Sequence, residues 1–341
     1  MLDGGRSSLQ LHLEAEGGLR GVGEATPLPR WSRESVEEAR GALERVDWSG
    51  TGIGLEGDLL SQVAALCTPV GPAVPSARFA LEVALLDLIG RALGRPIHRL
   101  LAPGGPALPV AVSALLDAGP DGDVLEKARA AVARGARTLK WKVGRAGAFE
   151  AELATLRGLR AGLESEVALR LDANGGFSDT DVEERLRVLA SLAPQIVEEP
   201  SPGWLESTFI PPVPLAADES LLRPGGVALV EEAVRGGRCA AVVLKPMLLG
   251  GLLRCLALAE RVRSLGATVV VTHSFDGPVA MAAAAGLALA LGSPQEAAGL
   301  WPHAGLAGFG VDPHRASAAL PFLDGGWLIP GDRSGLGLEA P

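Results

Sequence analysis

The sequence predicts an α/β protein whose main domain is a TIM-type (β/α) barrel and whose smaller domain is α+β. Its 341 residues exceed an ordinary single domain, so one large and one smaller domain are expected. From residue 110 onwards, short β-branched or apolar runs alternate with longer helical stretches. Such alternation is typical of a parallel sheet, and closure into a barrel is the common solution at this length. An open doubly wound sheet is the structural alternative.

The first part of the chain lacks this alternation, and we expect it to form the smaller unit. Ser8–Glu16 alternates apolar and polar residues, which predicts a half-exposed strand. A Gly- and Pro-rich loop is expected at Gly21–Pro29, followed by a helix over Ser32–Val46 with Ser32 as its cap. Ser76–Leu93 places its apolar residues on one helical face. The stretch Pro103–Pro109 then marks a domain boundary.

The strands and helices of the expected barrel follow this boundary. The strands are predicted at Val110–Ser113, Thr138–Val143, Ala168–Asp172, Gln195–Glu198, Leu215–Asp218, Ala241–Lys245, Thr268–Thr272 and Glu296–Leu300. Helices are predicted at Val124–Ala133, Phe149–Ala161, Asp179–Leu192, Gly226–Arg235, Leu252–Leu265 and Gly277–Leu291. In a parallel barrel the carboxyl ends of all strands point to one rim, which is where catalytic groups lie.

Composition and charge exclude several classes of function. Hydrophobic residues make up 48% of the chain, which suits a large core and not a disordered protein. A net charge of −9 without any Lys/Arg run argues against nucleic-acid binding. No apolar run is long enough for a membrane span, and the N-terminus has no apolar signal segment. Three widely spaced cysteines indicate reduced thiols, so we expect a cytoplasmic protein.

Charged residues stand at the ends of five consecutive predicted strands. Charges are rarely buried without a partner, because removing one from water costs several kcal/mol. The steps between these strand ends are roughly 20 to 30 residues, about one βα unit each. We therefore expect one rim to collect Lys140, Lys142, Asp172, Glu198, Asp218 and Lys245.

Three convergent carboxylates cannot all ionise cheaply unless a cation neutralises them. A set of oxygen ligands without His or Cys suits a hard ion, so Mg²⁺ is expected, with Mn²⁺ as the alternative. A lysine near a metal and a second cation has a lowered pKa and can act as a base. A metal on a substrate carboxylate would stabilise the enediolate left when the α-proton departs.

Taken singly, these residues also have structural explanations. A strand-end Asp commonly caps a helix or forms a turn, and Lys-x-Lys commonly lies on a solvated strand face. A glutamate of Glu198–Glu199 could simply pair with a nearby lysine. These explanations do not account for five such residues in order at one rim. The combination therefore favours a catalytic site.

The motif series K-x-K, LDAN, EEP, DES and LKP with a following GG resembles the enolase superfamily, in its muconate-lactonising subgroup. The resemblance covers nearly the whole chain. It implies that residues 1–105 with about 321–341 form a capping domain over a modified barrel at residues 106–320. It implies metal ligands at Asp172, Glu198 and Asp218, and two acid/base lysines on opposite faces of the substrate, Lys142 and Lys245. It implies that Lys140 lies beside the substrate carboxylate, and that the two supporting residues are Asn174 and Glu199.

Within the subgroup the chain is most similar to o-succinylbenzoate synthases, on the stretches GVGEATPLPRWSRES, KVGR and LKPMLLGG. This implies a hydro-lyase of menaquinone biosynthesis that dehydrates 2-succinyl-6-hydroxy-2,4-cyclohexadiene-1-carboxylate. Lys142 would remove the α-proton and help hydroxide leave, and Lys245 would stabilise the enediolate by its charge. Ser113 and Ser274 are candidates for the succinyl side, and His273 is a further candidate for the site. Gly21–Ser35 and Gly50–Asp58 would be lid loops.

Two alternatives remain open on sequence. An N-succinylamino acid racemase or dipeptide epimerase would use the same two lysines for a 1,1-proton transfer. The segment GLWPHAGL lacks the Asp-x-Asp of the dipeptide epimerases of the subgroup, which weakens that alternative. The second alternative is a barrel that binds a metabolite without catalysis. In each case the partner is a small-molecule carboxylate, and a homo-oligomer is compatible with the sequence.

Overall fold

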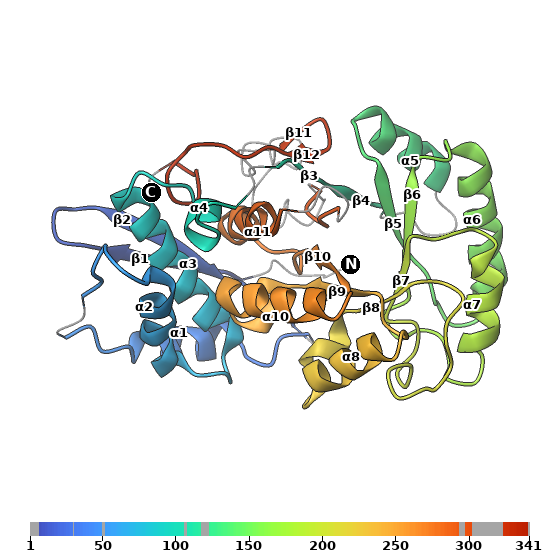
Figure 1. The fold of residues 1–341 in the computed structure, drawn as a ribbon, viewed down its shortest axis with the longest axis horizontal. Helices are drawn as coiled ribbons and strands as arrows, with labels where there is room; N and C mark the ends of the chain where they lie inside the picture. The colour runs from blue at the N-terminus through green and yellow to red at the C-terminus, as the bar shows by residue number, and fades with distance from the viewer. Residues whose placement is uncertain are drawn as a thin grey trace.

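A computed structural model describes residues 7–29, 31–49, 52–105, 108–116, 123–292, 297–301 and 323–339. Its N-terminal elements lie beside a parallel sheet that carries helices, as Figure 1 shows. None of the helices in the described ranges has the length and apolar character needed to span a bilayer. The three cysteines, Cys67, Cys239 and Cys255, are buried and form no disulfide.

The N-terminal region pairs a β-hairpin with helices. Strands β1 and β2 are antiparallel, and β1 alternates half-buried and exposed residues as the sequence predicts. The helix after them begins at Ser35, not at Ser32, because Ser35 and Glu38 form a capping box. The elements are β1 (Leu9–Glu14), β2 (Arg20–Ala25), α1 (Val36–Glu44), α2 (Leu59–Leu66), a 3₁₀ turn (Thr68–Val70), α3 (Pro75–Ala92) and α4 (Ile97–Leu101).

The predicted loop Gly21–Pro29 is wrong in its first half, because residues 20–25 form β2. Gly21 and Gly23 suggest a loop, yet both face α3 across a very short distance. A Cβ at Gly23 would lie 1.8 Å from the carbonyl oxygen of Ala80, and one at Gly21 would lie 2.3 Å from that of Ala84. The glycines therefore serve close packing of a strand on a helix.

Seven parallel strands form the main sheet, in the order β10-β9-β8-β7-β6-β5-β4. The strands are β4 (Ser113–Leu116), β5 (Thr138–Lys142), β6 (Ala168–Asp172), β7 (Ile196–Glu198), β8 (Leu215–Ala217), β9 (Ala241–Leu244) and β10 (Thr268–Val271). The helices are α5 (Val124–Ala133), α6 (Phe149–Gly162), α7 (Val182–Ala190), α8 (Gly226–Arg235), α9 (Pro246–Leu249), α10 (Leu252–Ser264) and α11 (Pro278–Leu291), with a 3₁₀ turn at Glu219–Leu222.

The single strand predicted at Val110–Ser113 is split in the structure. β3 (Val110–Ala111) joins β12 (Trp327–Leu328) and β11 (Leu323–Asp324) in a small antiparallel sheet. β4 then enters the parallel sheet. The predicted eighth strand is present only as isolated bridges, since Ala298 bridges Val112 and Gly299 bridges Thr272. Glu296 lies outside the described residues.

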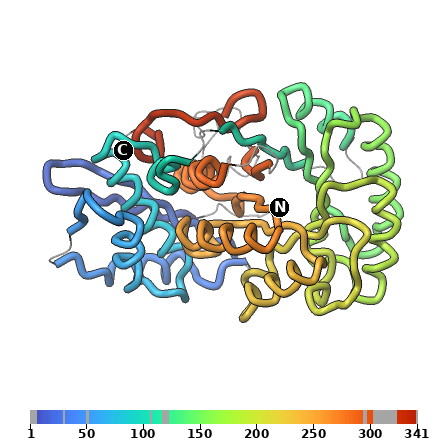
Figure 2. Tube along the Cα trace, in the orientation of Figure 1, coloured from blue at the N-terminus to red at the C-terminus, as the bar shows by residue number. Residues whose placement is uncertain are grey.

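The C-terminal segment returns to the N-terminal region, as the tube in Figure 2 shows. Asp87 of α3 accepts hydrogen bonds from the backbone N–H groups of Val22 in β2 and Leu336 near the C-terminus. Arg91 donates to the carbonyl oxygen of Leu338. One cluster of buried apolar side chains runs through the N-terminal elements and the helices of the main sheet. The two parts therefore share a core.

Gly23→Ala tests the close packing of β2 on α3. The added methyl group must push strand and helix apart, so we expect a loss of about 1–3 kcal/mol of unfolding free energy or more. Gly158→Ala is the matched control, because a Cβ at this position in α6 meets nothing within 4 Å. There we expect a gain of roughly 0.5–1 kcal/mol from helix propensity. Chemical denaturation measures both, and equal effects would contradict the packing argument.

Candidate active site

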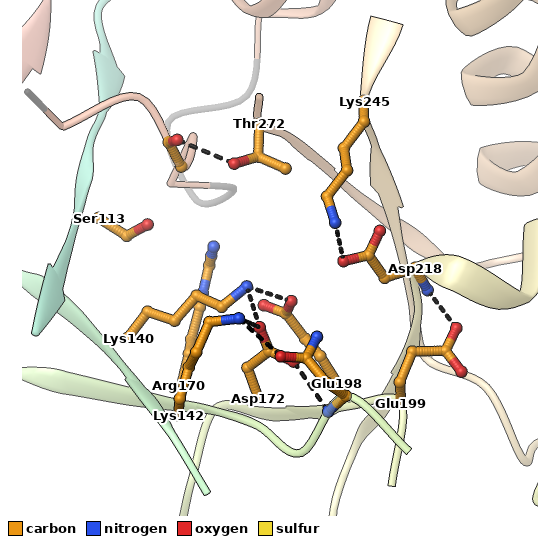
Figure 3. Close-up of polar contacts among 12 residues, drawn as sticks. Ser113, Lys140, Lys142, Arg170, Asp172, Glu198, Glu199, Asp218, Lys245 and Thr272 are labelled. Carbon is orange, nitrogen blue, oxygen red and sulfur yellow. Dashed lines mark hydrogen bonds and ion pairs between the residues drawn. The ribbon is translucent and has the colours of Figure 1, made fainter. Parts of the chain in front are cut away.

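The charged residues predicted for the site lie together at the carboxyl ends of β5 to β9. Side chains of a strand alternate between its two faces. Apolar residues from β7 to β10 form a small cluster on one face. In β7, β8 and β9 these residues precede a charged site residue by two or four positions, an even spacing that puts both on the same face. The cluster consists of Ile196, Ala216, Ala241, Val243 and Val270. Alternation thus brings Glu198, Asp218 and Lys245 to the same face as this cluster, at the strand ends. Figure 3 shows the three charged side chains together.

Register places the residues of neighbouring strands side by side. Lys142 pairs with Asp172 between β5 and β6, and Asp172 pairs with Glu198 between β6 and β7. Asp218 and Lys245 directly follow β8 and β9. The three carboxylates are 1–3% exposed. Three buried negative charges at one rim require nearby positive charges.

Lys140 supplies one of these charges. Its Nζ lies 2.9 Å from Oδ2 of Asp172 and 2.5 Å from Oε2 of Glu198. Burial alone would lower the pKa of Lys140, but the two carboxylates raise it above its usual value. Burial raises the pKa of Asp172, yet the charges of Lys140 and Lys142 outweigh this and lower it. Lys140 is therefore a cation that holds two carboxylates together.

Lys142 is the most open of the three lysines. Its side chain is 50% exposed, against 17% for Lys140 and 16% for Lys245. Its Nζ donates to Oδ1 of Asn174 at 2.6 Å and lies 3.9 Å from Oδ2 of Asp172. Asn174 has a left-handed backbone (φ 45°), which Asn tolerates better than most residues. The amide of Asn174 thus orients Lys142 at the mouth of the site.

Lys245 faces the carboxylates from the other side, where it pairs with Oδ2 of Asp218. Burial would lower the pKa of Lys245, but the charges of Asp218 and Glu219 raise it. The lowered pKa that the sequence predicts is for a lysine beside a bound metal, and it stays a prediction. Its Nζ also lies 5.9 Å from the ring centre of Trp31, a cation–π contact from the loop after β2.

Glu199 points away from the centre and fixes the neighbouring loop. One oxygen accepts the backbone N–H groups of Asp218 and Ser220 at 2.6 and 2.7 Å. The other accepts the Ser220 hydroxyl and the Trp204 indole N–H at 2.8 and 3.0 Å. A backbone φ of 39° at Glu199 turns its carboxylate out of the strand direction. Its supporting role, predicted by resemblance, has a clear geometric basis.

The donor chemistry of Asp172, Glu198 and Asp218 fits a hard divalent cation. Burial raises the pKa of Glu198, and although Lys140 opposes this, the charges of Asp172 and Asp218 raise it further. The three carboxylates therefore lie close enough for their negative charges to repel one another. Within the described residues, no three acidic, His or Cys side chains are already gathered around a metal position. Lys140 and Lys245 contact one oxygen of each carboxylate, namely Oδ2 of Asp172, Oε2 of Glu198 and Oδ2 of Asp218.

A pocket opens above this centre. It is lined by the three lysines, by Asp172, Asn174 and Glu219, and by apolar and aromatic side chains. Ser113, Ser274 and His273 all line it, in keeping with their place as candidates. The backbone N–H of Ser113 donates to the carbonyl oxygen of Ala298. The remaining lining residues are Leu28, Trp31, Leu115, Leu248, Thr272, Phe275, Gly299 and Trp301.

Sequence reasoning missed three residues of the site. Glu219 accepts the Asn174 amide at 2.6 Å, and burial with the charge of Asp218 raises its pKa to about 7. Arg170 is 3% exposed and donates to the carbonyl oxygen of Ala297. Trp31 contacts Lys245. Two signals were available: Arg170 stands two residues before Asp172, and Glu219 stands inside DES.

Two family models match the chain. Residues 6–102 match the mandelate racemase / muconate lactonizing enzyme N-terminal domain. Residues 123–340 match the enolase C-terminal domain-like family. Together they include the N-terminal elements and β5 to β10 of the parallel sheet with the charged rim.

Named relatives have several activities. The L-Lys-D/L-Arg epimerase of Methylococcus capsulatus is 29% identical over 83% of this chain and 79% of its own length. An o-succinylbenzoate synthase of Desulfotalea psychrophila is 31% identical over 62% of this chain and 58% of its own. The crystal structure of a dipeptide epimerase from Methylococcus capsulatus, complexed with Mg, superimposes with a TM-score of 0.78 and 26% identity, covering 98% and 94% of the two chains. The fold, the charged rim and both family models agree that the chain belongs to the enolase superfamily.

Proposed function

We propose that the protein is an o-succinylbenzoate synthase, a hydro-lyase that acts on 2-succinyl-6-hydroxy-2,4-cyclohexadiene-1-carboxylate. The observation that carries this is the charge of the pocket. Three lysines line it, against two carboxylates in its described lining. Asp172 pairs with Lys140, and Oε1 of Glu219 accepts the Asn174 amide while its buried Oε2 has no hydrogen-bond partner among the described residues. A lining with more cationic than anionic side chains favours a dianionic substrate.

The apolar part of the lining supports a hydrocarbon ring. Leu28, Leu115, Leu248 and Phe275 line the pocket together with two tryptophans. A pocket of this kind binds a ring by burial and orients it by a few polar groups. We propose that Ser113 and Ser274, which line the pocket, contact the succinyl side chain, although the Ser113 hydroxyl donates to the carbonyl oxygen of Ala298 in this structure.

The reaction removes one proton and one hydroxyl group from adjacent ring carbons and leaves an aromatic ring and water. Lys142 is placed to take the α-proton, since it is half exposed and held by Asn174. The same ammonium group then returns a proton to the leaving hydroxide on that face. Lys245 approaches from the opposite side as a cation, which suits stabilising negative charge on the substrate carboxylate and not removing its proton.

Asp172, Glu198 and Asp218 would hold the divalent cation, which we propose is Mg²⁺, with Mn²⁺ as an alternative. When bound, it supplies positive charge for the substrate carboxylate as the α-proton leaves. Lys140 keeps two of these ligands in place. Glu199 fixes the backbone of Asp218, the third.

An N-succinylamino acid racemase or dipeptide epimerase is the second candidate. The epimerase relative aligns over more of this chain than the synthase relative does. Lys142 and Lys245 approach the centre from opposite sides, which is the arrangement that a 1,1-proton transfer needs. A dipeptide also carries an ammonium group, for which the unpartnered Oε2 of Glu219 is the candidate acceptor in the described lining.

The proposal extends to the architecture. We propose a complete (β/α) barrel at residues 106–320, capped by residues 1–105 with about 321–341. The bridges of residues 298–299 to both edges of the parallel sheet support closure. A homo-oligomer is compatible with this arrangement.

A direct dehydration assay tests the synthase. Loss of the conjugated diene changes the absorbance, and we expect it with Mg²⁺ and not with a chelator. Lys142→Ala should lower kcat by about 10²–10⁴-fold, because the general base is gone. Lys127→Ala, which removes an exposed lysine of α5, is the matched control and should leave kcat unchanged. Turnover that survives in Lys142→Ala would contradict the role of this base.

An exchange assay in D₂O separates the two candidates. If the protein is a racemase or epimerase, deuterium enters the α-carbon of N-succinylamino acids or dipeptides, and Lys142→Ala and Lys245→Ala each abolish exchange from one enantiomer. We expect slow or no exchange with these compounds. Fast exchange together with an intact diene would reject the synthase in favour of this candidate.

Glu199→Gln tests the support of the metal site. Glu199 accepts from four donors with two oxygens, whereas Gln keeps only one oxygen and its NH₂ group must face one of the two donor pairs. The loop that carries Asp218 is then held less firmly. We expect Mg²⁺ affinity to fall about 10–100-fold, measured by titration calorimetry. Glu206→Gln, an exposed partner of Arg223, is the control and should bind Mg²⁺ as the wild type does. Unchanged affinity in Glu199→Gln would remove this residue from the metal site.

A further inference from the structure

Helices α10 and α11 both begin at a glycine. Gly251 and Gly277 are their N-cap residues, and neither offers a side-chain oxygen to the first backbone amides of its helix. These amides have no partner within a helix, so buried ones need an acceptor from elsewhere.

The N-terminal region supplies both acceptors. Oε2 of Glu24, in β2, accepts the backbone N–H of Ala280, the third residue of α11, at 3.0 Å. Oε1 of Glu82, in α3, accepts the backbone N–H of Leu253, the second residue of α10, at 3.0 Å. These glutamates are 1% and 0% exposed and stand 256 and 171 residues from their partners.

The two N-cap glycines leave room for these carboxyl groups. A Cβ at Gly277 would lie 1.9 Å from Oε1 of Glu24, and a Cβ at Gly251 would lie 2.5 Å from Oε2 of Glu82. A residue with its own capping side chain cannot stand at either position. A remote carboxyl group thus replaces the local cap at both helices.

Each of these helices follows a segment that builds the pocket. Residues 272–275 line the pocket and lead into α11. Lys245 leads through α9 into α10, and the N–H groups of Gly250 and Gly251 both donate to the carbonyl oxygen of Pro246. Figure 1 shows α10 beside α3, and α11 beside α4, where the N-terminal elements meet the rest of the chain.

We propose that Glu24 and Glu82 are positioning residues that fix these pocket segments from the N-terminal region. Glu82 holds the start of α10 and thereby the segment that carries Lys245. Glu24 holds the start of α11 and thereby residues 272–276. The consequence for turnover rests on the proposed function, whereas the coupling of each glutamate to its segment does not.

Hydrogen exchange followed by mass spectrometry on the full chain tests the coupling. Glu24→Ala should speed exchange in peptides that cover residues 272–282, and Glu82→Ala in peptides that cover 245–255, each by about tenfold. Neither should loosen the other segment. Asp123→Ala is the matched control, because Asp123 caps α5 from its own N-cap position and accepts the N–H of Glu126. It should affect the start of α5 alone.

Kinetics separates positioning from general stability. With the diene substrate, Glu82→Ala should mainly lower kcat, because it displaces Lys245, and Glu24→Ala should mainly raise KM, because it displaces the pocket wall. Each effect should be about tenfold or more. Glu24→Gln and Glu82→Gln keep a carbonyl acceptor and should restore most of the loss. Asp123→Ala should change neither constant.

Three results would overturn the proposal. The first is faster exchange throughout the chain, and the second is unchanged exchange in both segments. The third is faster exchange in the segment of the other glutamate, with unaltered kcat and KM. If an Ala variant does not fold, Glu24→Asp and Glu82→Asp replace it. Each shortens the side chain by one methylene and so moves the carboxyl group away from the helix, and the same exchange and kinetic measurements are made. If the wild type does not use the diene, the exchange experiment still decides the coupling, and α-proton exchange in D₂O replaces the kinetic assay.

Discussion

The neutralisation of three buried carboxylates is the constraint on which the site depends. Asp172, Glu198 and Asp218 lie almost fully out of solvent at one rim, where uncompensated charge would cost several kcal/mol for each group. Direct ion pairs with Lys140 and Lys245 offset this free-energy cost. The same oxygens are the natural ligands of a hard cation. The lysines and a metal would therefore share the oxygens of these three carboxylates.

The three lysines differ in their surroundings. Lys140 is buried between two carboxylates that neutralise its charge. Lys142 is open to the pocket, donates to the amide of Asn174 and lies 3.9 Å from Oδ2 of Asp172. Lys245 stays a cation on the opposite side.

The N-terminal region is part of this arrangement and not only a cover. Trp31 reaches Lys245, and Thr26 donates to the sulfur of Met247, two residues after Lys245. Glu24 and Glu82 meet the starts of two helices that follow pocket segments. Such contacts link the position of the N-terminal region to the geometry of the rim, so a displacement of one alters the other.

The sequence by itself determined the parallel alternation and the charged strand ends, because both arise from local periodicity and from residues adjacent to each strand. It predicted Lys142, Asp172, Glu198, Asp218 and Lys245 as one group. Only the tertiary structure decided that Gly21 and Gly23 belong to a packed strand, that Lys245 has a raised pKa, and that remote glutamates cap α10 and α11. These features depend on contacts between residues far apart in the chain, and strand periodicity carries no record of such contacts.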